Sequence, residues 1–384
     1  MIFDKGYSIR IDGLRCLNRR HHGVQCDHCR RHCPANAVII DQDRVDLDSN
    51  LCNGCGLCLS DCPTQVFSSG QWDETSVIGR VNVQGWKITE FFCARHLFPY
   101  QEDKVRNRGA VQLPACLSIV SRGGWYELGL KTAIELHLDQ CEGCPMSQTI
   151  PRLEWSIGTA AEWLAASGHH PEFSFIHSGG NGGVKKRQKA VETGLKVTSR
   201  RDLFLSLISR GEKAAKEMLT GQTSHPEVND PEKFHSVVPD WLKRLSELYP
   251  SNMKESSSSA FWPTIKINDH CVHCSLCTLF CPSGALQNIT SDGACAYTYK
   301  AGLCLDCRIC QLVCDRQAII RDKETLANPF DTAVIYQSPV IECHRCGRMA
   351  SDASTGLCYW CQKEAVIEHA FKDACQVLLN PSGK

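Results

Sequence analysis

Apolar and polar positions alternate along the middle of the chain in a pattern of short strands and one long helix. Four apolar runs have the length of buried strands: KITEFFC (87–93), GAVQLPAC (109–116), AIELHLDQCEGC (133–144) and EFSFIH (172–177). After the third run, one helical face is predicted from Ile150, Leu153, Ile157, Ala161 and Leu164. Strands that alternate with helices predict a central α/β domain with a parallel sheet and right-handed crossovers.

Shorter runs lie outside this block. ANAVII (35–40) and RQAIIRD (316–322) each follow a group of cysteines and have the length of small strands. Residues 185–217 hold ten Lys and Arg against four acids, and their leucines have helical spacing. This predicts a solvated helix between domains, with docking to an acidic partner as the alternative. SSSS at 256–259 predicts a linker.

Length and charge limit the classes of protein that the chain can belong to. Its 384 residues correspond to two to four modules, and its formal net charge is zero. A neutral chain has no strong field toward nucleic acid, so we do not expect nucleic acid as a partner. No apolar segment follows Met1 and no run of about 18 apolar residues occurs, so neither export nor a membrane span is indicated.

The number and spacing of the cysteines indicate a more specific chemistry. The chain contains 26, and most of them lie two or three residues from the next one. Disulfide scaffolds are short and follow no metal-ligand spacing, whereas this spacing suits thiolate ligands. Available thiolates require a reducing compartment, so we expect a cytoplasmic protein.

Three runs have the spacing C-x2-C-x2-C-x3-C. They consist of Cys52, Cys55, Cys58 and Cys62; Cys271, Cys274, Cys277 and Cys281; and Cys304, Cys307, Cys310 and Cys314. A fourth run, Cys26, Cys29 and Cys33, has Gly23 where its first cysteine belongs. Three thiolates two residues apart can bind one cubane cluster, and the fourth cysteine then binds the neighbouring cluster.

Residues 16–70 and 264–325 resemble bacterial dicluster ferredoxin modules on these runs. The resemblance implies four 4Fe–4S clusters. Three of the implied ligand sets are complete: Cys33, Cys52, Cys55 and Cys58; Cys271, Cys274, Cys277 and Cys314; and Cys281, Cys304, Cys307 and Cys310. The fourth set has Cys26, Cys29 and Cys62 and lacks one ligand.

Several residues compete for the missing position. Cys16 could complete a cubane, because Gly23 lets the intervening loop turn back and cluster iron favours thiolate. His21 or His22 could bind instead, or a three-iron cluster could need only three thiolates. Cys16 would otherwise be a buried structural thiol. We expect Cys16 to be the ligand.

Four more cysteines, Cys93, Cys116, Cys141 and Cys144, follow the predicted strands of the middle block. They should converge, because open parallel sheets place their sites at the carboxyl ends of strands. The block resembles the small iron–sulfur subunit of hydrogenase and heterodisulfide reductase complexes in CLSIVSRGGWYELGL (116–130) and CEGC (141–144). This implies a further 2Fe–2S or 4Fe–4S cluster. Zinc, or a redox-active Cys141–Cys144 dithiol, stays open.

The tail has the spacing C-x2-C-x11-C-x2-C, formed by Cys343, Cys346, Cys358 and Cys361. Two such knuckles give a tetrahedral sulfur site that suits structural zinc, with rubredoxin-type iron as the alternative. Residues 362–379 are predicted to form a helix on this zinc-ribbon-like domain. Cys295 and Cys375 remain and are expected to be structural thiols.

These patterns predict an α+β multidomain chain with two dicluster modules, a central α/β domain and a zinc-ribbon-like tail. The predicted segments are 1–75, 76–183, 184–260 (basic helical segment and linker), 261–328 and 329–384. They predict an electron-transfer protein or subunit that relays single electrons between redox partners in a hetero-complex. No dinucleotide fingerprint and no catalytic residue is identified, so a free-standing enzyme is not expected.

Two other functions stay open. A catalytic reductase subunit would bind its substrate at the middle cluster. A redox-sensing or assembly protein would report the state of its clusters to a partner.

Overall fold

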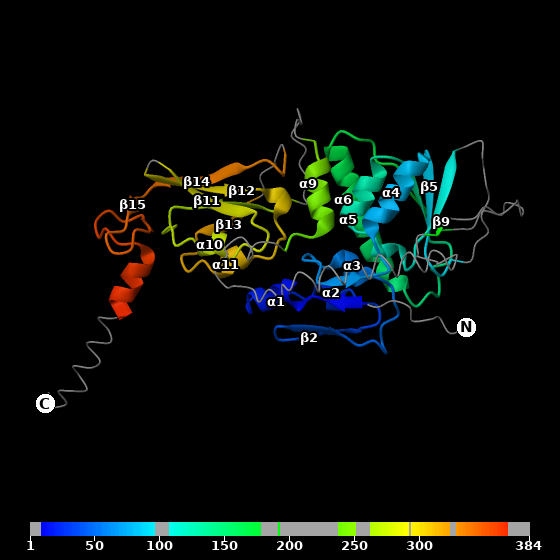
Figure 1. The fold of residues 1–384 in the computed structure, drawn as a ribbon, viewed down its shortest axis with the longest axis horizontal. Helices are drawn as coiled ribbons and strands as arrows, with labels where there is room; N and C mark the ends of the chain where they lie inside the picture. The colour runs from blue at the N-terminus through cyan, green and yellow to red at the C-terminus, as the bar shows by residue number, and fades with distance from the viewer. Residues whose placement is uncertain are drawn as a thin grey trace, which may run out of the picture. The chain divides into compact units, whose positions relative to one another are not determined.

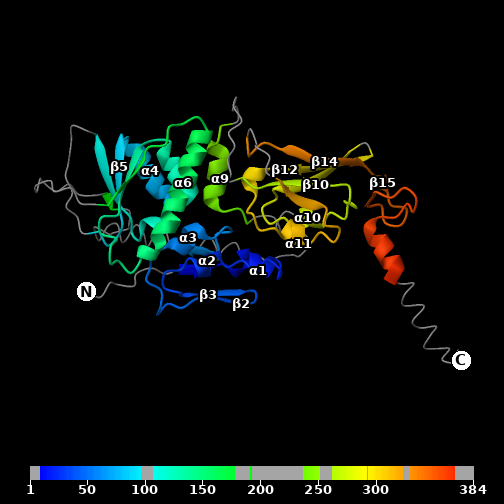
Figure 2. The ribbon, with the colours of Figure 1, turned by 180° about the vertical axis from the view of Figure 1, so that it is seen from behind.

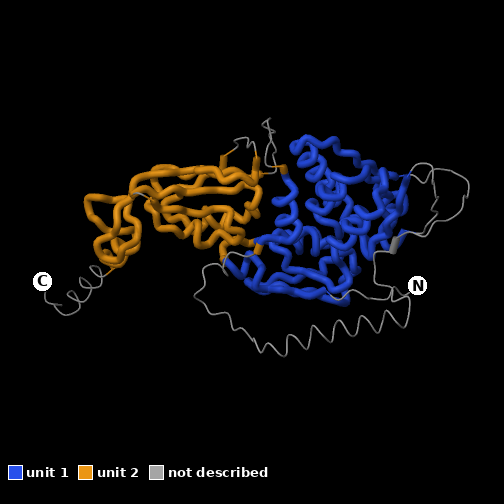
Figure 3. The backbone as a smooth tube through the Cα atoms, turned by 45° about the horizontal axis from the view of Figure 1, so that its top comes forward, with its two compact units in different colours: residues 1–20, 26–234, 238–249 blue, residues 21–25, 235–237, 250–384 orange. Residues whose placement is uncertain are grey.

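The computed structural model describes residues 9–96, 107–177, 191–192, 237–250, 262–291, 293–322 and 328–367. The chain divides into two compact units (Figure 3). Unit 1 comprises residues 1–20, 26–234 and 238–249, and unit 2 comprises residues 21–25, 235–237 and 250–384. The predicted linker at 256–259, most of the basic segment and Cys375 lie outside the described residues.

Unit 1 contains a five-stranded parallel sheet, with β5 and β9 labelled in Figure 1. Its strand order is β8 (Phe173–Ile176), β7 (Ala133–His137), β5 (Ile88–Phe92), β6 (Arg108–Gln112) and β9 (Val191–Glu192). Every neighbouring pair is parallel, which confirms the predicted sheet type. Strands β5 to β8 match the four predicted runs. The two-residue strand β9, within the basic segment, was not predicted.

Helices pack beside this sheet (Figure 2). They are α4 (Glu74–Gln84), α5 (Arg122–Gly129), α6 (Ile150–Ala166) and α9 (Asp240–Leu248), with the short turns η2 (Leu117–Ile119) and η3 (Ser147–Thr149). Helix α5 contacts α4, α6, α9 and β7, and its Trp125 packs edge-on against Phe91 of β5. Leu153, Ile157 and Leu164 form the buried face of α6, as the apolar spacing predicted.

The N-terminal cysteine segment of unit 1 has little regular structure. It contains β1 (Ile9–Ile11) paired with β4 (Phe67–Ser69), β2 (Val38–Asp41) paired with β3 (Arg44–Leu47), and the short helices η1 (Gly13–Arg15), α1 (Leu17–Arg20), α2 (His28–Arg31) and α3 (Leu57–Asp61). Both strand pairs are antiparallel. Cys16 and Cys62 form part of the small buried core together with Val38, Val66 and Phe67.

Unit 2 repeats this plan and adds a larger sheet. Its elements are β10 (Thr264–Ile267) paired with β13 (Ile319–Asp322), the helices α10 (Leu276–Leu279), η4 (Ala301–Leu303) and α11 (Ile309–Leu312), and the antiparallel sheet β11 (Leu286–Ser291), β12 (Ala294–Tyr299) and β14 (Ala333–Pro339). Cys295 is fully buried on β12 beside Tyr297 in the core of this unit.

The tail begins with the hairpin β15 (Ile341–Glu342) and β16 (Met349–Ala350). Residues 359–367 are helical, and the rest of the helix predicted for 362–379 lies outside the described residues.

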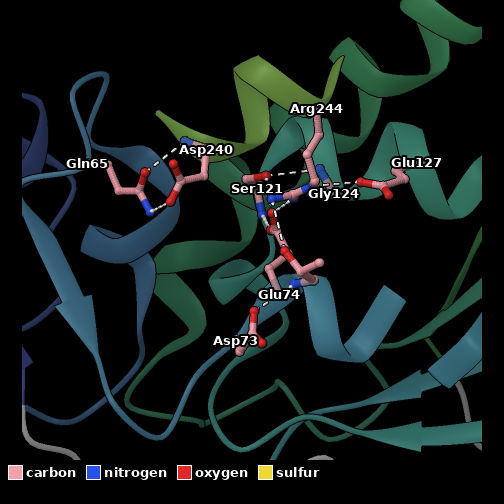
Figure 4. Close-up of polar contacts among 9 residues, drawn as sticks. Gln65, Asp73, Glu74, Ser121, Gly124, Glu127, Asp240 and Arg244 are labelled. Carbon is pink, nitrogen blue, oxygen red and sulfur yellow. Dashed lines mark hydrogen bonds and ion pairs between the residues drawn. The ribbon is translucent and has the colours of Figure 1, made fainter. Parts of the chain in front are cut away.

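Helix α9 is held to the rest of unit 1 by a partly buried ion-pair network (Figure 4). Arg244 Nη2 donates to Glu74 Oε2 at 2.6 Å, and Arg244 Nε donates to Glu127 Oε2 at 2.9 Å. The Glu74 carboxylate also accepts the backbone N–H and the hydroxyl of Ser121, at 2.6 and 2.9 Å, where α5 begins. A Cβ on Gly124 would lie 2.6 Å from this carboxylate, so a larger residue there would displace Glu74 from the network.

This network connects residues that are far apart in the sequence. They lie around α5, the helix that follows Cys116. Asp240 N–H donates to Gln65 Oε1 at 2.8 Å, which ties the start of α9 to the loop after Cys62 (Figure 4). Burial raises the pKa of the Glu74 carboxyl, and the charge of Arg244 opposes that shift. The carboxylate therefore depends on Arg244 for compensation of its charge.

Replacement of Arg244 by methionine should release α9. It leaves the partly buried Glu74 without its cation, which costs about 2 kcal/mol. The free energy of local opening, measured by hydrogen exchange at the α9 amides, should fall by that amount. In the control Lys243→Met, an exposed ion pair with Asp240 at 3.2 Å is lost, and the change should stay below about 0.5 kcal/mol. Equal exchange in the two variants would contradict this account.

Candidate metal centres

The four cysteine runs share one local structure. In each, a short helix carries the third cysteine of the motif: Cys29 on α2, Cys58 on α3, Cys277 on α10 and Cys310 on α11. No disulfide joins the cysteines that the structure describes. The repeated spacing therefore corresponds to a repeated backbone with available thiols.

The end of each run repeats as well. The third residue after the last cysteine has a left-handed backbone in all four runs: Asn36 (φ 49°), Gln65 (54°), Gly284 (67°) and Gln317 (50°). In three runs the next N–H donates to the cysteine sulfur, from Ala37 to Cys33 (3.3 Å), from Val66 to Cys62 (3.4 Å) and from Ala318 to Cys314 (3.2 Å). Such N–H groups stabilise negative charge on sulfur.

The first run differs from the others at its beginning. In the three complete runs, both residues that flank the second cysteine have positive φ, and these residues are Gly54 and Gly56, His273 and Ser275, and Asp306 and Arg308. In the first run Gln25 has positive φ, but Asp27 after Cys26 has a φ of −127°. The backbone of this run therefore departs from the repeat near the position where its first cysteine is missing.

Cys16 lies with the three cysteines of the incomplete set. Burial is the main cause that raises the pKa of Cys26 to about 11, and the nearby thiols of Cys62 and Cys16 raise it further. Burial also raises the pKa of Cys29 and of Cys62, and Cys16 is again among the neighbours that add to the shift. The structure thus brings together the four thiols that the sequence grouped.

Two polar side chains that the sequence did not single out hold Cys16 in this place. Asn18 Nδ2 donates to the carbonyl of Cys26 at 2.9 Å, and the N–H of Cys26 donates to Asn18 Oδ1 at 2.6 Å. Arg15 Nε donates to the carbonyl of Thr64 at 2.7 Å, in the loop that follows Cys62. Asn18 is buried, so its two bonds fasten the turn that bears Cys16 to the incomplete run.

The alternative histidine ligands are engaged locally. His21 Nδ1 accepts the N–H of Gly23 at 3.2 Å, and the His21 ring stacks on His22 with centroids 5.0 Å apart.

The other predicted sets also converge. Each of these sets lines its own small cavity. A cavity of about 20 Å³ is lined by Cys33, Cys52, Cys55 and Cys58, and another of about 20 Å³ is lined by Cys271, Cys274, Cys277 and Cys314. A third, of about 30 Å³, is lined by Cys281, Cys304, Cys307 and Cys310. Within the first of these sets, burial and neighbouring thiols raise the pKa of Cys55 to about 12. Closely grouped, buried thiols of this kind suit metal, whose positive charge offsets that of the thiolates.

The four middle cysteines meet at the carboxyl edge of the parallel sheet. Cys93 directly follows β5, Cys141 and Cys144 follow β7, and all three line one cavity of about 600 Å³ with Cys116. Burial, followed by Cys93 and Cys116, raises the pKa of Cys141 to about 12. The N–H of Cys116 donates to the carbonyl of Cys55 at 3.3 Å, so this set adjoins the set of Cys33, Cys52, Cys55 and Cys58.

A polar network beside the middle set was not predicted. His96 Nε2 lies 3.1 Å from Asp139 Oδ1, and His137 Nε2 lies 3.2 Å from Glu90 Oε2. Arg108 Nη1 contacts Glu90 at 3.1 Å and Glu135 at 2.7 Å. The signal was present in the sequence, because Glu135 and His137 occupy alternate positions of an otherwise apolar strand, and Glu90 stands opposite Glu135 in the neighbouring one.

A second unpredicted network joins the cysteine helices to α6. His32 Nδ1 lies 2.6 Å from Asp61 Oδ2, and Arg152 of α6 pairs with the same carboxylate. Burial raises the pKa of Asp61, but the hydrogen bond from His32 and the charge of Arg152 outweigh burial and lower it overall. Asp61 therefore stays ionised at its place between Cys58 and Cys62.

The tail cysteines form a compact four-sulfur group. The Sγ atoms of Cys343, Cys346, Cys358 and Cys361 lie within 4.8 Å of one another, as a tetrahedral metal site requires. Hydrogen bonds from backbone N–H groups, led by Cys358, lower the pKa of Cys343 to about 6, which favours negative charge within this group of sulfurs. Trp360 Nε1 donates to the carbonyl of Cys274 at 3.2 Å, which packs the tail against a ferredoxin-type run.

These repeated cysteine loops have the pattern of 4Fe–4S ferredoxin modules. Over 70 residues the chain is 34% identical to the ferredoxin-type protein NapF of Haemophilus influenzae. The match covers 16% of this chain and 38% of that protein, so the chain spans less than half of that relative's length. No protein-family model matches the chain. Among the described helices, none is long and apolar enough to cross a membrane.

Replacement of Asn18 by alanine should expose the incomplete set. In metal-free protein, a pKa of about 11 leaves little Cys26 thiolate at pH 8. Exposure moves that pKa down toward about 8.5, so the thiolate fraction and the rate of alkylation should rise, by about tenfold or more. Mass spectrometry of iodoacetamide-treated protein measures the rate at Cys26. The exposed control Asn50→Ala should leave it unchanged, and an unchanged rate in Asn18→Ala would contradict the proposed role of Asn18.

Proposed function

We propose that the chain is an iron–sulfur electron-transfer protein or subunit that relays single electrons between a donor protein and an acceptor protein. The observation that carries this proposal is the gathering of twenty cysteines into five groups of four. The partial similarity to a ferredoxin-type protein supports it. When bound, 4Fe–4S clusters supply one-electron carriers whose potentials depend on burial and on hydrogen bonds to sulfur.

The cysteines of the two dicluster segments would hold four 4Fe–4S clusters. The ligand sets proposed are Cys16, Cys26, Cys29 and Cys62; Cys33, Cys52, Cys55 and Cys58; Cys271, Cys274, Cys277 and Cys314; and Cys281, Cys304, Cys307 and Cys310. Cys93, Cys116, Cys141 and Cys144 would hold a fifth cluster, of two or four irons. Cys343, Cys346, Cys358 and Cys361 would hold zinc.

Within each unit, neighbouring cysteine sets lie next to each other, which supports electron transfer from one cluster to the next. In unit 1, the thiol of Cys29 is among the neighbours that raise the pKa of Cys58, and Cys116 bonds to the backbone of Cys55. Each of these three sets therefore adjoins the next one. In unit 2, Cys310 is likewise among the neighbours of Cys277. Short separations of this kind favour electron hopping between clusters.

The protein's own part in the relay is to position the thiolates and to set their surroundings. N–H groups at Cys33, Cys62 and Cys314 stabilise charge on sulfur. No acid, base or nucleophile is required for this function. Donor and acceptor are expected to be redox proteins within a hetero-complex, in a reducing compartment such as the cytoplasm.

A second candidate function is a reductase subunit that binds a substrate at the middle cluster. The specific observation in its favour is the volume of the middle cavity, about 600 Å³, which is larger than a set of four cysteine ligands alone requires.

Metal analysis of anaerobically purified protein tests the relay. We expect about 18 to 20 iron, a similar amount of sulfide and about one zinc per chain. Cys16→Ser should lose about one iron or about four, as one ligand or one whole cluster is lost. The matched control Cys295→Ala removes a buried thiol outside every set and should keep all the iron.

Two other results would count against parts of the proposal. About 15 to 16 iron, unchanged in Cys16→Ser, would make Cys16 a structural thiol and leave the middle set without iron, and a count of about 15 would add a three-iron site in the first segment. Iron near zero, with zinc in its place, would contradict the relay as a whole.

A further inference from the structure

The middle cavity differs in size from the cavities of the other cysteine sets. At about 600 Å³ it is at least 20 times larger than the cavities of about 20 to 30 Å³ that three other four-cysteine sets enclose. A cluster held by four cysteines has similar dimensions in each place. The surplus volume at the middle set therefore exceeds what the same kind of group would occupy.

The walls of this cavity describe what would fill the surplus. Aliphatic side chains come from the N-terminal cysteine segment, from the sheet edge and from α6: Ile9, Ile11, Leu47, Leu117, Leu138, Ile150 and Leu153. A volume of several hundred Å³ with mainly apolar walls and a few polar groups is typical of small-molecule sites. The cavity lies within unit 1, so its walls belong to one compact body.

The charges at the cavity limit the ligand further. Asp46 and Arg95 both line it, with opposite sign, and the imidazoles of His96 and His137 add polar surface near Asp139. The walls therefore suit an uncharged molecule.

We propose that the cavity between the N-terminal cysteine segment and the sheet edge of unit 1 binds an uncharged, mainly apolar small molecule beside the middle cysteine set. Because Cys52 and the four middle cysteines all line the cavity, the bound molecule lies next to two cysteine sets. The site itself rests on the cavity and its walls. A redox role for the molecule rests on the proposed electron-transfer function.

Benzophenone tests this site, since it is uncharged and mainly apolar and inserts into nearby C–H bonds under near-ultraviolet light. Iron-loaded protein is irradiated with increasing benzophenone, and peptide mass spectrometry locates the adducts. Labelling should saturate and should fall on cavity residues such as Ile150, Leu153 and Leu138. Saturating benzophenone should also shift the EPR spectrum of the reduced protein, because the probe lies beside the clusters.

Two variants fill the cavity, and one serves as control. Ile150→Trp should reduce saturable labelling about tenfold by occupying the space of the probe. Glu154→Trp adds the same side chain to an exposed position on the same helix and should change labelling less than about twofold. If Ile150→Trp does not fold, Ile11→Trp fills the cavity from β1 instead.

The outcomes separate this proposal from the proposed function. Labelling that does not saturate, that falls outside the cavity, or that is equal in the filled and control variants would overturn the binding site. Iron content is measured on the same samples. Protein that lacks iron but labels in the cavity would overturn the relay and keep the site, and iron-loaded protein without saturable labelling would do the reverse.

Discussion

The bond between metal and thiolate is the interaction on which the cysteine segments depend. The core of the N-terminal cysteine segment contains few apolar side chains, and Cys16 and Cys62 make up part of it themselves. Burial and neighbouring thiols raise the pKa of Cys26 and of Cys62, so without metal these two groups stay protonated. A bound cation reverses that preference and converts metal affinity into folding free energy. The strands and helices around each set are short because metal replaces a larger apolar core.

The fold must also bring together thiols that are far apart in the sequence. The incomplete run lacks the backbone turn of its three relatives, and a single side chain, Asn18, replaces it by pairing with both backbone groups of Cys26. At the middle set, the parallel sheet does the same work by ending neighbouring strands at one edge. Arg244 of helix α9 and the partly buried Glu74 hold the start of α5, which follows Cys116. Asn18 and the sheet edge thus bring together thiols that are far apart in sequence.

What the sequence could predict followed from local rules. Cysteine spacing predicted which thiols meet, because three ligands fall within one loop, and alternating apolar runs predicted the sheet. Asn18, the contact between Glu74 and Arg244 across 170 positions, and the networks around Asp61 and Glu90 were missed. They depend on tertiary approach between polar side chains, which leaves no periodic pattern. The large middle cavity was missed for the same reason, since a cavity is defined by segments that do not touch in sequence.

The central claim is that neighbouring sets in unit 1 form one continuous electron path. EPR spectroscopy of the protein during stepwise reduction tests it most directly. The account predicts that the signals of the Cys33, Cys52, Cys55 and Cys58 cluster and of the middle cluster broaden each other once both are reduced, because Cys55 and Cys116 are in contact. The broadening should disappear in Cys93→Ser. Signals that stay sharp and independent throughout the reduction would contradict a connected path.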